Sequence, residues 1–287
     1  MGNNNSAGTA KTAAAPAYAK VNLFLEVLGK RGDGYHDIVT VMQRISLCDS
    51  VSVALTDGGI GVVCDREELS GKNNIAFSAA ESFFAAANIR GGAFISIKKR
   101  IPVKAGLGGG SSDAGTVLVL LNDLCGRPLS AEELRKVGFS VGADVPFFTA
   151  GCSAALVEGA GERVTPVDGL KNCFFTVVMS GEKRSTRDMY DRLDGMERTA
   201  APHADMLGAL KMGDPAEAGK NLYNAFERVG GADPAVYAAI RRRGPLGVLL
   251  CGSGPGVFAL CGDRASADGI AGLPELRGAG TFVAEPC

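Results

Sequence analysis

Residues 17–27 alternate between apolar side chains on one face and a mostly polar set on the other. The second set consists of Tyr18, Lys20, Asn22, Phe24 and Glu26. A period of two over this length predicts a half-buried β-strand near the start of the chain. The fold therefore contains a sheet, and the order of the remaining elements decides its class.

Short apolar or alternating runs predict further strands at residues 39–47, 50–55, 94–98, 153–157, 174–179 and 280–284, and on both sides of a glycine turn within 246–262. Helical spacing and start signals predict helices at residues 73–87, from Asp113 or Ala114 to 124, after Ser130, and at 187–193, 202–211, 215–228, 234–243 and 263–271. Strands gather towards both ends with helices between them, which predicts an α+β fold of two subdomains. We expect an N-terminal domain at residues 17–168, a C-terminal domain at 169–287, and a disordered tail at 1–16.

Charge and hydropathy exclude several classes of protein. The formal net charge is −1 and the basic residues form no stripe, so no nucleic-acid partner is expected. No apolar run has the length of a transmembrane helix, and the N-terminus lacks the apolar core of a signal peptide. A soluble, cytoplasmic protein without a membrane partner is therefore expected. The 8 cysteines are scattered and there are only 2 histidines, so no metal ligand is predicted.

Residues 105–115 read AGLGGGSSDAG, between a predicted strand and a predicted helix. Ser111 stands where a Walker loop or a dinucleotide fingerprint needs glycine, so neither pattern is present. The physical requirements of a phosphate site are nevertheless met. Glycines let backbone N–H groups converge, Ser111 and Ser112 offer hydroxyls and helix N-caps, and the helix start is positive. Lys104 could add a counter-charge. The alternative is a flexible glycine hinge.

Two charged residues are candidates for chemistry. Lys20 and Asn22 share the polar face of the first strand, about 7 Å apart at two residues' rise. A lysine there could simply be solvated. Asp144 lies in the stretch VGADVPFF, where an isolated carboxylate is costly without a partner. It could cap a helix, or it could pair with a lysine and face a substrate hydroxyl.

Two loops could contact ligands. Tyr35 and His36, in the stretch GDGYH, could stack on a heterocycle and hydrogen-bond to it, although a turn with a packed tyrosine would look the same. The stretch CGSGPG at residues 251–256 is consistent with a simple hairpin. It has more glycines than a hairpin needs, which favours a close approach of the backbone to another group.

Three stretches together resemble the motifs of the GHMP kinase superfamily. They are AKVNLFLEV at residues 19–27, PVKAGLGGGSSDAG at 102–115 and LLCGSGPGVFAL at 249–260. The resemblance extends from about residue 17 to 284. It implies a two-subdomain α+β fold, with a ribosomal protein S5 domain 2-like N-terminal part and a ferredoxin-like C-terminal part. The stretches GYH, GADVPFF and GAGERV are similar to the branch that phosphorylates a cytidine diphosphate-linked methylerythritol for isoprenoid precursors.

The resemblance also implies roles for individual residues, with ATP and Mg²⁺ as cofactors. Lys20 and Asp144 match catalytic positions of the family. The ATP-binding positions match Pro102, Val103, Lys104, Ala105, Gly106, Leu107, Gly108, Gly109, Gly110, Ser111 and Ser112. The substrate-binding positions match Asn22, Tyr35, His36, Thr186 and Tyr190. The implied partner is the small-molecule substrate, with the chain a monomer or a weak homodimer.

The sequence departs from the family pattern at two places, and two alternative functions remain. Gly115 stands where the family often has alanine, which should weaken the helix by about 0.5–1 kcal/mol. The stretch NLYNAFE leaves the role of Asn224 open. A kinase of the homoserine or mevalonate type is one alternative function, although such enzymes have no cytosine to recognise. A non-catalytic sensor of nucleotide and metabolite is the other.

Overall fold

The computed structural model describes residues 11–179, 181, 184–196, 202–230 and 233–287. Its larger sheet has the strand order β3-β4-β2-β1-β8, and β5 and β6 extend it from one half of β2. These strands are β1 (Thr12–Lys30), β2 (His36–Thr56), β3 (Gly59–Cys64), β4 (Gly92–Lys98), β5 (Ala154–Gly159), β6 (Arg163–Pro166) and β8 (Tyr223–Asn224).

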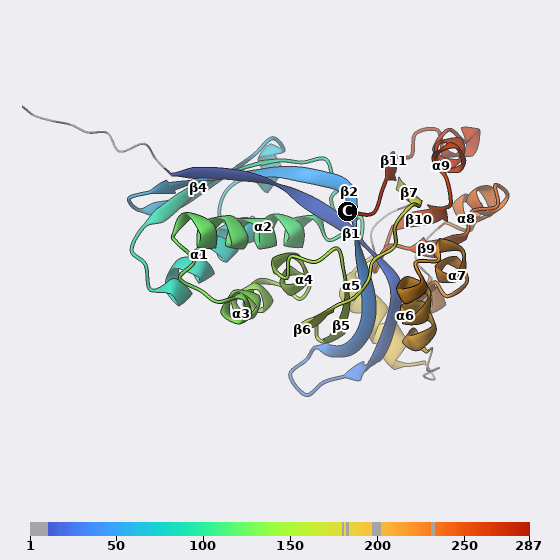
Figure 1. Cartoon of the computed structure of the whole chain (residues 1–287), viewed down its shortest axis with the longest axis horizontal. Coiled ribbons are helices and arrows are strands. Elements are labelled where there is room, and N and C mark those ends of the chain that lie inside the picture. Colours follow the sequence, from blue (N-terminus) through green and yellow to red (C-terminus); the bar gives the residue numbers. More distant parts are fainter. Residues whose placement is uncertain (1–10, 180, 182–183, 197–201, 231–232) are drawn as a thin grey trace, which may run out of the picture.

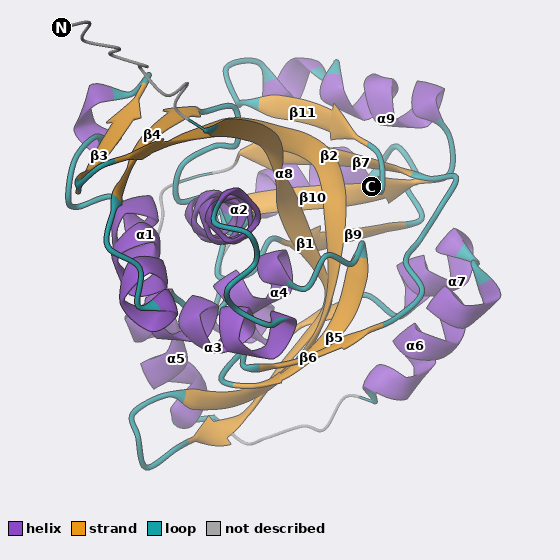
Figure 2. Cartoon of the chain, turned by 60° about the vertical axis from the view of Figure 1, so that its left-hand side comes forward, coloured by secondary structure: helices purple, strands orange, loops and turns teal. Residues whose placement is uncertain are grey.

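The long antiparallel pair of β1 and β2 is bent, and the bend shapes the molecule. The register between the two strands shifts at three points, one of them between Asn22 and Phe24. Such bulges bend a strand and increase its twist. One half of β2 pairs with β4 and the other half with β5, so β2 forms one continuous strand where two were predicted. Figure 2 shows the resulting curl of the sheet around α2.

The predicted tail is too long. Thr12 already pairs with Ala54 of β2, and residues 12–16 belong to β1. Small side chains such as those of Ala13 and Ala15 pack against the hydrophobic core, which gives this polar-looking segment a reason to be ordered. The part of the predicted tail at residues 1–10 lies outside the described residues.

Four helices lie on the concave face of the larger sheet: α1 (Ile75–Ala87), α2 (Gly109–Leu124), α3 (Ala131–Val141) and α4 (Val145–Thr149). Figure 1 shows them below β1, β2 and β4. Their apolar faces pack on strand residues such as Val53 and Ile95. The predicted start signals are confirmed, because Asn74 caps α1 and Ser130 forms a capping box with Glu133. Within the described residues, no helix has the length and apolarity to cross a membrane.

The smaller sheet has the order β11-β7-β10-β9 and is antiparallel throughout. Its strands are β7 (Phe174–Met179), β9 (Gly247–Leu250), β10 (Gly256–Cys261) and β11 (Thr281–Ala284). The helices of this half are α5 (Thr186–Asp194), α6 (His203–Met212), α7 (Pro215–Lys220), α8 (Pro234–Arg241) and α9 (Arg264–Ala271). Short 3-10 helices are η1 (Glu67–Leu69), η2 (Ala225–Val229) and η3 (Pro274–Leu276).

The helix predicted at residues 215–228 is wrong beyond Lys220. There the chain forms β8, in which Tyr223 and Asn224 pair in parallel with Phe24 and Leu25 of β1. Pairing with a distant strand overrides the local helical spacing. The same crossing links the two halves, and one hydrophobic cluster contains residues of both. The domain division between residues 168 and 169 therefore stays a prediction.

Candidate active site

The polar face of β1 is buried, so the prediction of a half-buried strand is wrong for this face. Lys20 is 4% exposed and Asn22 is 1% exposed. The Lys20 Nζ donates to Asn22 Oδ1 at 2.8 Å and to the Gly106 carbonyl at 3.2 Å. Asn22 Nδ2 in turn donates to Thr40 Oγ1 at 2.8 Å. A buried ammonium held by this chain of acceptors is not the solvated lysine of the alternative interpretation.

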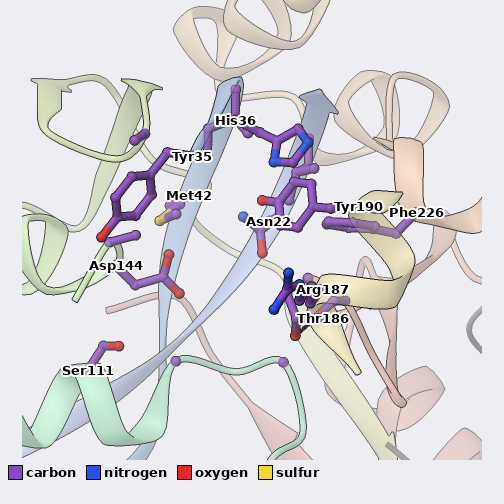
Figure 3. A pocket seen from close by; sticks show the side chains of 18 of the residues that line it. Asn22, Tyr35, His36, Met42, Ser111, Asp144, Thr186, Arg187, Tyr190 and Phe226 are labelled. Carbon is purple, nitrogen blue, oxygen red and sulfur yellow. Dashed lines mark hydrogen bonds between the residues drawn. The ribbon is translucent and has the colours of Figure 1, made fainter. Parts of the chain in front are cut away.

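Asp144 forms an ion pair with this lysine. Its Oδ2 lies 3.5 Å from Lys20 Nζ, and its side chain is 32% exposed. Asp144 occupies the N-cap position of α4, but among the described residues its side chain accepts no capping hydrogen bond. The carboxylate is therefore free to face the cavity, as Figure 3 shows. The paired-carboxylate interpretation fits its contacts better than the capping one.

The glycine-rich loop leads directly into α2, which begins earlier than predicted. The helix starts at Gly109, with Gly108 as its N-cap at φ 70°. Ser111 and Ser112 therefore lie in its first turns, and the prediction that they are N-caps is wrong. Glycine allows the left-handed conformation at position 108, so the helix can start within the loop. The N–H groups of the first turn have no intrahelical partner and can bind an anion.

The second glycine turn packs against the first loop. A Cβ atom on Gly106 would lie 1.8 Å from the Cys251 carbonyl oxygen, so only glycine fits there. The Gly256 N–H donates to the Ala105 carbonyl at 3.2 Å. The predicted close approach of the 251–256 turn is thus confirmed, and its partner is the glycine-rich loop. The turn also forms the hairpin of β9 and β10.

Asn224 holds this second turn in position. Its Nδ2 donates to the carbonyls of Leu250 at 2.9 Å and Gly252 at 2.8 Å. Its Oδ1 accepts from the Phe226 N–H at 3.0 Å. We assign a structural role to Asn224, because all three of these hydrogen bonds are buried and join its side chain to backbone groups.

Two cavities meet at the glycine loop. The first, of about 690 Å³, is lined by Lys20, Asn22, Tyr35, His36, Asp144, Thr186 and Tyr190, among others. The second, of about 400 Å³, is lined by residues 102–111 together with residues from the loop before α1 and its first turn. Gly106, Gly108 and Ser111 line both. The structure thus brings all the predicted substrate residues to one side of the loop.

Aromatic side chains form the far end of the first cavity (Figure 3). The rings of His36 and Tyr190 are stacked, with centroids 4.3 Å apart. Asp194 fixes the imidazole, since both of its carboxylate oxygens lie 3.0 Å from His36 Nε2. Burial, reinforced by the charge of Asp144, raises the pKa of the Tyr190 phenol, which therefore stays neutral. Tyr35 is 51% exposed at the rim.

Three more predicted site residues lie in different surroundings. Thr186 lines the first cavity, where its hydroxyl lies 2.9 Å from that of Ser253 in the second glycine turn. Lys104 is exposed on the loop, with a left-handed backbone at φ 59°. Ser112 is buried, and in the described part of the chain its hydroxyl has no hydrogen-bond partner. It lies behind the loop and does not line either cavity.

Several lining residues were not predicted from the sequence. The first cavity also contains Met42, Arg187, Asp191 and Ser253. The second contains Asn73, Asn74, Lys99 and Asp113. Asn73 and Asn74 were predicted only as the start of a helix. A helix cap that directly follows a loop could also have indicated a ligand site. Nothing in the local pattern distinguishes Lys99 from its solvated neighbour Lys98.

Comparison with known proteins shows the family to which the chain belongs. The family model "GHMP kinases N terminal domain" matches residues 74–152, and "GHMP kinases C terminal" matches residues 206–272. Curated relatives match over most of the chain. The chain belongs to the GHMP kinases, the class of ATP-dependent small-molecule kinases whose two-subdomain α+β fold was expected from the sequence.

The curated relatives specify the class further. A protein of Geobacter sulfurreducens is 44% identical over 85% of this chain and 88% of its own length, and one of Geobacter metallireducens is 41% identical over 91% and 93%. Both are named 4-diphosphocytidyl-2-C-methyl-D-erythritol kinase. A crystal structure of 4-(cytidine 5'-diphospho)-2C-methyl-D-erythritol kinase superposes with a TM-score of 0.77 at 31% identity, over 96% of this chain and 100% of the other. A homoserine kinase from Cytophaga hutchinsonii, with a TM-score of 0.72 at 18% identity over 96% and 94%, shares the fold.

Proposed function

We propose that this chain transfers the γ-phosphate of ATP to the 2-hydroxyl of 4-diphosphocytidyl-2-C-methyl-D-erythritol. The name of its relatives supports this substrate. The observation that carries the proposal is the Lys20–Asp144 pair, which lies where an acceptor cavity meets a glycine loop.

The second cavity is proposed to hold ATP. Its lining by Gly108, Gly109 and Gly110 leaves backbone N–H groups and the positive end of α2 open to the β- and γ-phosphates. Gly108 has a left-handed backbone at φ 70°, which favours glycine, and a Cβ atom there would lie 3.0 Å from Lys20 Cγ, a tight contact. The amide of Asn73 also lines this cavity and is available for the base, whereas the amide of Asn74 is engaged with Leu69 and Ala76.

The first cavity is proposed to hold the acceptor. Asp144 accepts the proton of the reacting hydroxyl as its oxygen attacks the γ-phosphorus. The bond from that phosphorus to the bridging oxygen breaks, and ADP leaves. Lys20 offsets the negative charge that spreads over the transferred group, and Asn22 fixes the ammonium by its 2.8 Å hydrogen bond. Such a transfer depends on positioning and charge stabilisation more than on covalent chemistry.

Recognition of the cytidine is assigned to the far end of the same cavity. His36 and Tyr190 offer a planar stacked surface, and Tyr35 borders it at the rim. Thr186 and Asn22 lie between this end and the loop and suit contact with the diphosphate and the polyol. Binding energy from the cytidine would position the hydroxyl for transfer.

Mg²⁺ is proposed to arrive with ATP. Within the described residues, no three His, Cys, Asp or Glu side chains gather where they could hold a metal ion. Mg²⁺ is commonly bound through substrate phosphates and water. We therefore assign the ion to the phosphates of ATP.

The test is to incubate the purified chain with ATP and each of three acceptors, and to follow ADP release and the phosphorylated product by ³¹P NMR. We expect one ADP per product with the cytidyl substrate, and negligible transfer to homoserine or mevalonate. Preference for either of these would favour the corresponding alternative. Binding of ATP and the cytidyl substrate without ADP release would make the chain a sensor. The predicted monomer or weak homodimer can be checked on the same sample by sedimentation.

A further inference from the structure

A cluster of three buried charges lies behind the glycine loop and takes no part in the proposed transfer. Lys99 Nζ forms ion pairs with Asp49 Oδ2 and, at 2.6 Å, with Asp113 Oδ2. All three side chains are almost fully buried. They come from β2, from the segment after β4 and from α2, so the cluster joins three elements.

The cluster is part of the wall of the proposed ATP cavity. Lys99 and Asp113 both line it, and a Cβ atom on Gly109 would lie 3.5 Å from Lys99 Nζ. Asp49 Oδ1 accepts the N–H groups of Arg100 at 2.5 Å and Ile101 at 2.8 Å, which fixes the chain leading into the loop. The charges therefore lie directly behind the N-terminus of α2.

The charges of this cluster do not balance. Two carboxylates face one ammonium, and among the described residues Asp113 Oδ1 has no hydrogen-bond partner. Lys99 and Asp49 are the charged groups that act on Asp113. The cavity residues Asn74 and Ile75, before and in α1, carry no charge, and Lys20 of β1 pairs with Asp144 instead.

Burial raises the pKa of Asp113 to about 7, against the opposing attraction of Lys99. Burial alone would lower the pKa of Lys99, but the two carboxylates together raise it, so the ammonium persists. Burial thus favours the protonated form of Asp113, the carboxyl whose Oδ1 lacks a partner among the described residues. Its protonated form gives a neutral cluster, and its ionised form leaves one negative charge behind the phosphate loop.

We propose that Asp113 tunes the affinity of the glycine loop for nucleotide phosphates, with tight binding when Asp113 is protonated and weaker binding when it is a carboxylate. It acts through the loop and the helix end, as a positioning residue that does not touch the phosphates. The inference rests on the proposed function, because it requires that the second cavity binds ATP or ADP. The positive end of α2 attracts the phosphates, and a carboxylate one turn into the helix opposes that attraction.

The experiment measures ADP binding by calorimetry, without acceptor, from pH 5.5 to 8.5 in the wild type and in Asp113→Asn. Asparagine keeps the shape, and its oxygen can accept from Lys99. As the pH rises, the affinity for ADP should fall about three- to tenfold more in the wild type than in Asp113→Asn. The reason is that the Asp113 carboxylate places one negative charge near the phosphates and repels them. The ratio of the two proteins cancels the titration of the ADP phosphate itself. Asp123→Asn, on the exposed side of α2, makes the same charge change away from the cavity and should match the wild type.

Parallel pH profiles for the wild type and Asp113→Asn would overturn the inference, as would an equal effect of Asp123→Asn. If Asp113→Asn does not fold, Asp113→Ser provides a second neutral variant for the same measurement. Failure of every protein, wild type included, to bind ADP would overturn the proposed function instead. ADP binding with parallel profiles would remove only the role of Asp113.

Discussion

Lys20 Nζ lies 3.5 Å from Asp144 Oδ2, and this ion pair lines the first cavity beside Gly106, which lines both cavities. β1 supplies the lysine and the start of α4 supplies the aspartate. Neither element could place the pair alone. The bend of β1 turns its polar face inward, and the packing of α4 on α2 sets the carboxylate opposite it. The geometry of the pair therefore depends on both sides of the cleft.

Replacement of Asp144 by Asn should lower kcat by about 10²–10⁴-fold, the range that a positioned proton acceptor contributes. The KM for ATP should change little, because the glycine-rich loop that we propose to bind the phosphates is intact. Steady-state kinetics with the cytidyl substrate checks this, with Asp123→Asn as a control that removes a carboxylate from an exposed helix face. Full activity of Asp144→Asn would remove the catalytic assignment.

Much of this site could be predicted from local sequence. The alternation of residues 17–27 gave the strand and the shared face of Lys20 and Asn22. The glycines at 106 and 108 gave the loop, and the surplus glycines of the 251–256 turn indicated a close backbone contact. Each of these inferences needs only the conformational freedom of a few neighbouring residues. Side-chain burial did not follow, because alternation alone cannot say whether a polar face meets water or a cleft.

The features that were missed depend on contacts between distant parts of the chain. β8 exists because residues 223–224 pair with β1, and α7 ends early for the same reason. Asp49 and Lys99 are 50 residues apart in the sequence and meet only after β2 and β4 have paired. A single sequence carries no signal for such pairings, so the buried charge cluster could not be anticipated.

Asp194 should be needed for acceptor binding, although it lies away from the reacting groups. Its carboxylate holds His36 Nε2 at 3.0 Å, which fixes the imidazole against Tyr190. In Asp194→Asn we expect the KM for the cytidyl substrate to rise about three- to tenfold, since one charge-assisted hydrogen bond is weakened. The value of kcat should stay close to that of the wild type.

Asp188→Asn is the matched control for Asp194→Asn, because Asp188 lies on the same helix but does not line the cavity. It should leave KM unchanged. A fall in kcat without a change in KM for Asp194→Asn would contradict the role in binding. Circular dichroism of both variants would show whether α5 is intact.

The pKa of Asp113 also predicts how stability depends on pH. Burial raises it from 3.8 to about 7, so the folded chain holds more protons than the unfolded chain between these values. Its contribution to stability is therefore fully present below pH about 4 and is lost as the pH rises through about 7. Asp113→Asn lacks this loss, so the variant should gain stability relative to the wild type as the pH rises from about 4 to about 7.

Thermal unfolding at several pH values measures this difference. A change of about 1 kcal/mol moves the Tm of a chain of this size by about 2–4 °C, so the effect is within reach. Asp123→Asn should show no such trend, because its carboxylate is largely exposed. A constant difference in Tm between Asp113→Asn and the wild type would show that the carboxyl of Asp113 does not titrate in this range.

Gly115 provides a final test, because helix propensity and packing predict opposite changes in stability when it is replaced by alanine. Helix propensity alone says that Gly115→Ala should stabilise α2 by about 0.5–1 kcal/mol. In the structure, however, a Cβ atom there would lie 2.6 Å from Phe148 Cβ. The clash would displace α4, so we expect a net loss of about 1–3 kcal/mol in the free energy of unfolding and lower kcat as Asp144 shifts.

The control is Gly208→Ala in α6, where the new Cβ atom meets nothing within 4 Å. This substitution should stabilise the chain by about 0.5–1 kcal/mol. Denaturant unfolding of both variants separates the two effects, and a stabilised Gly115→Ala with full activity would show that α4 yields without cost.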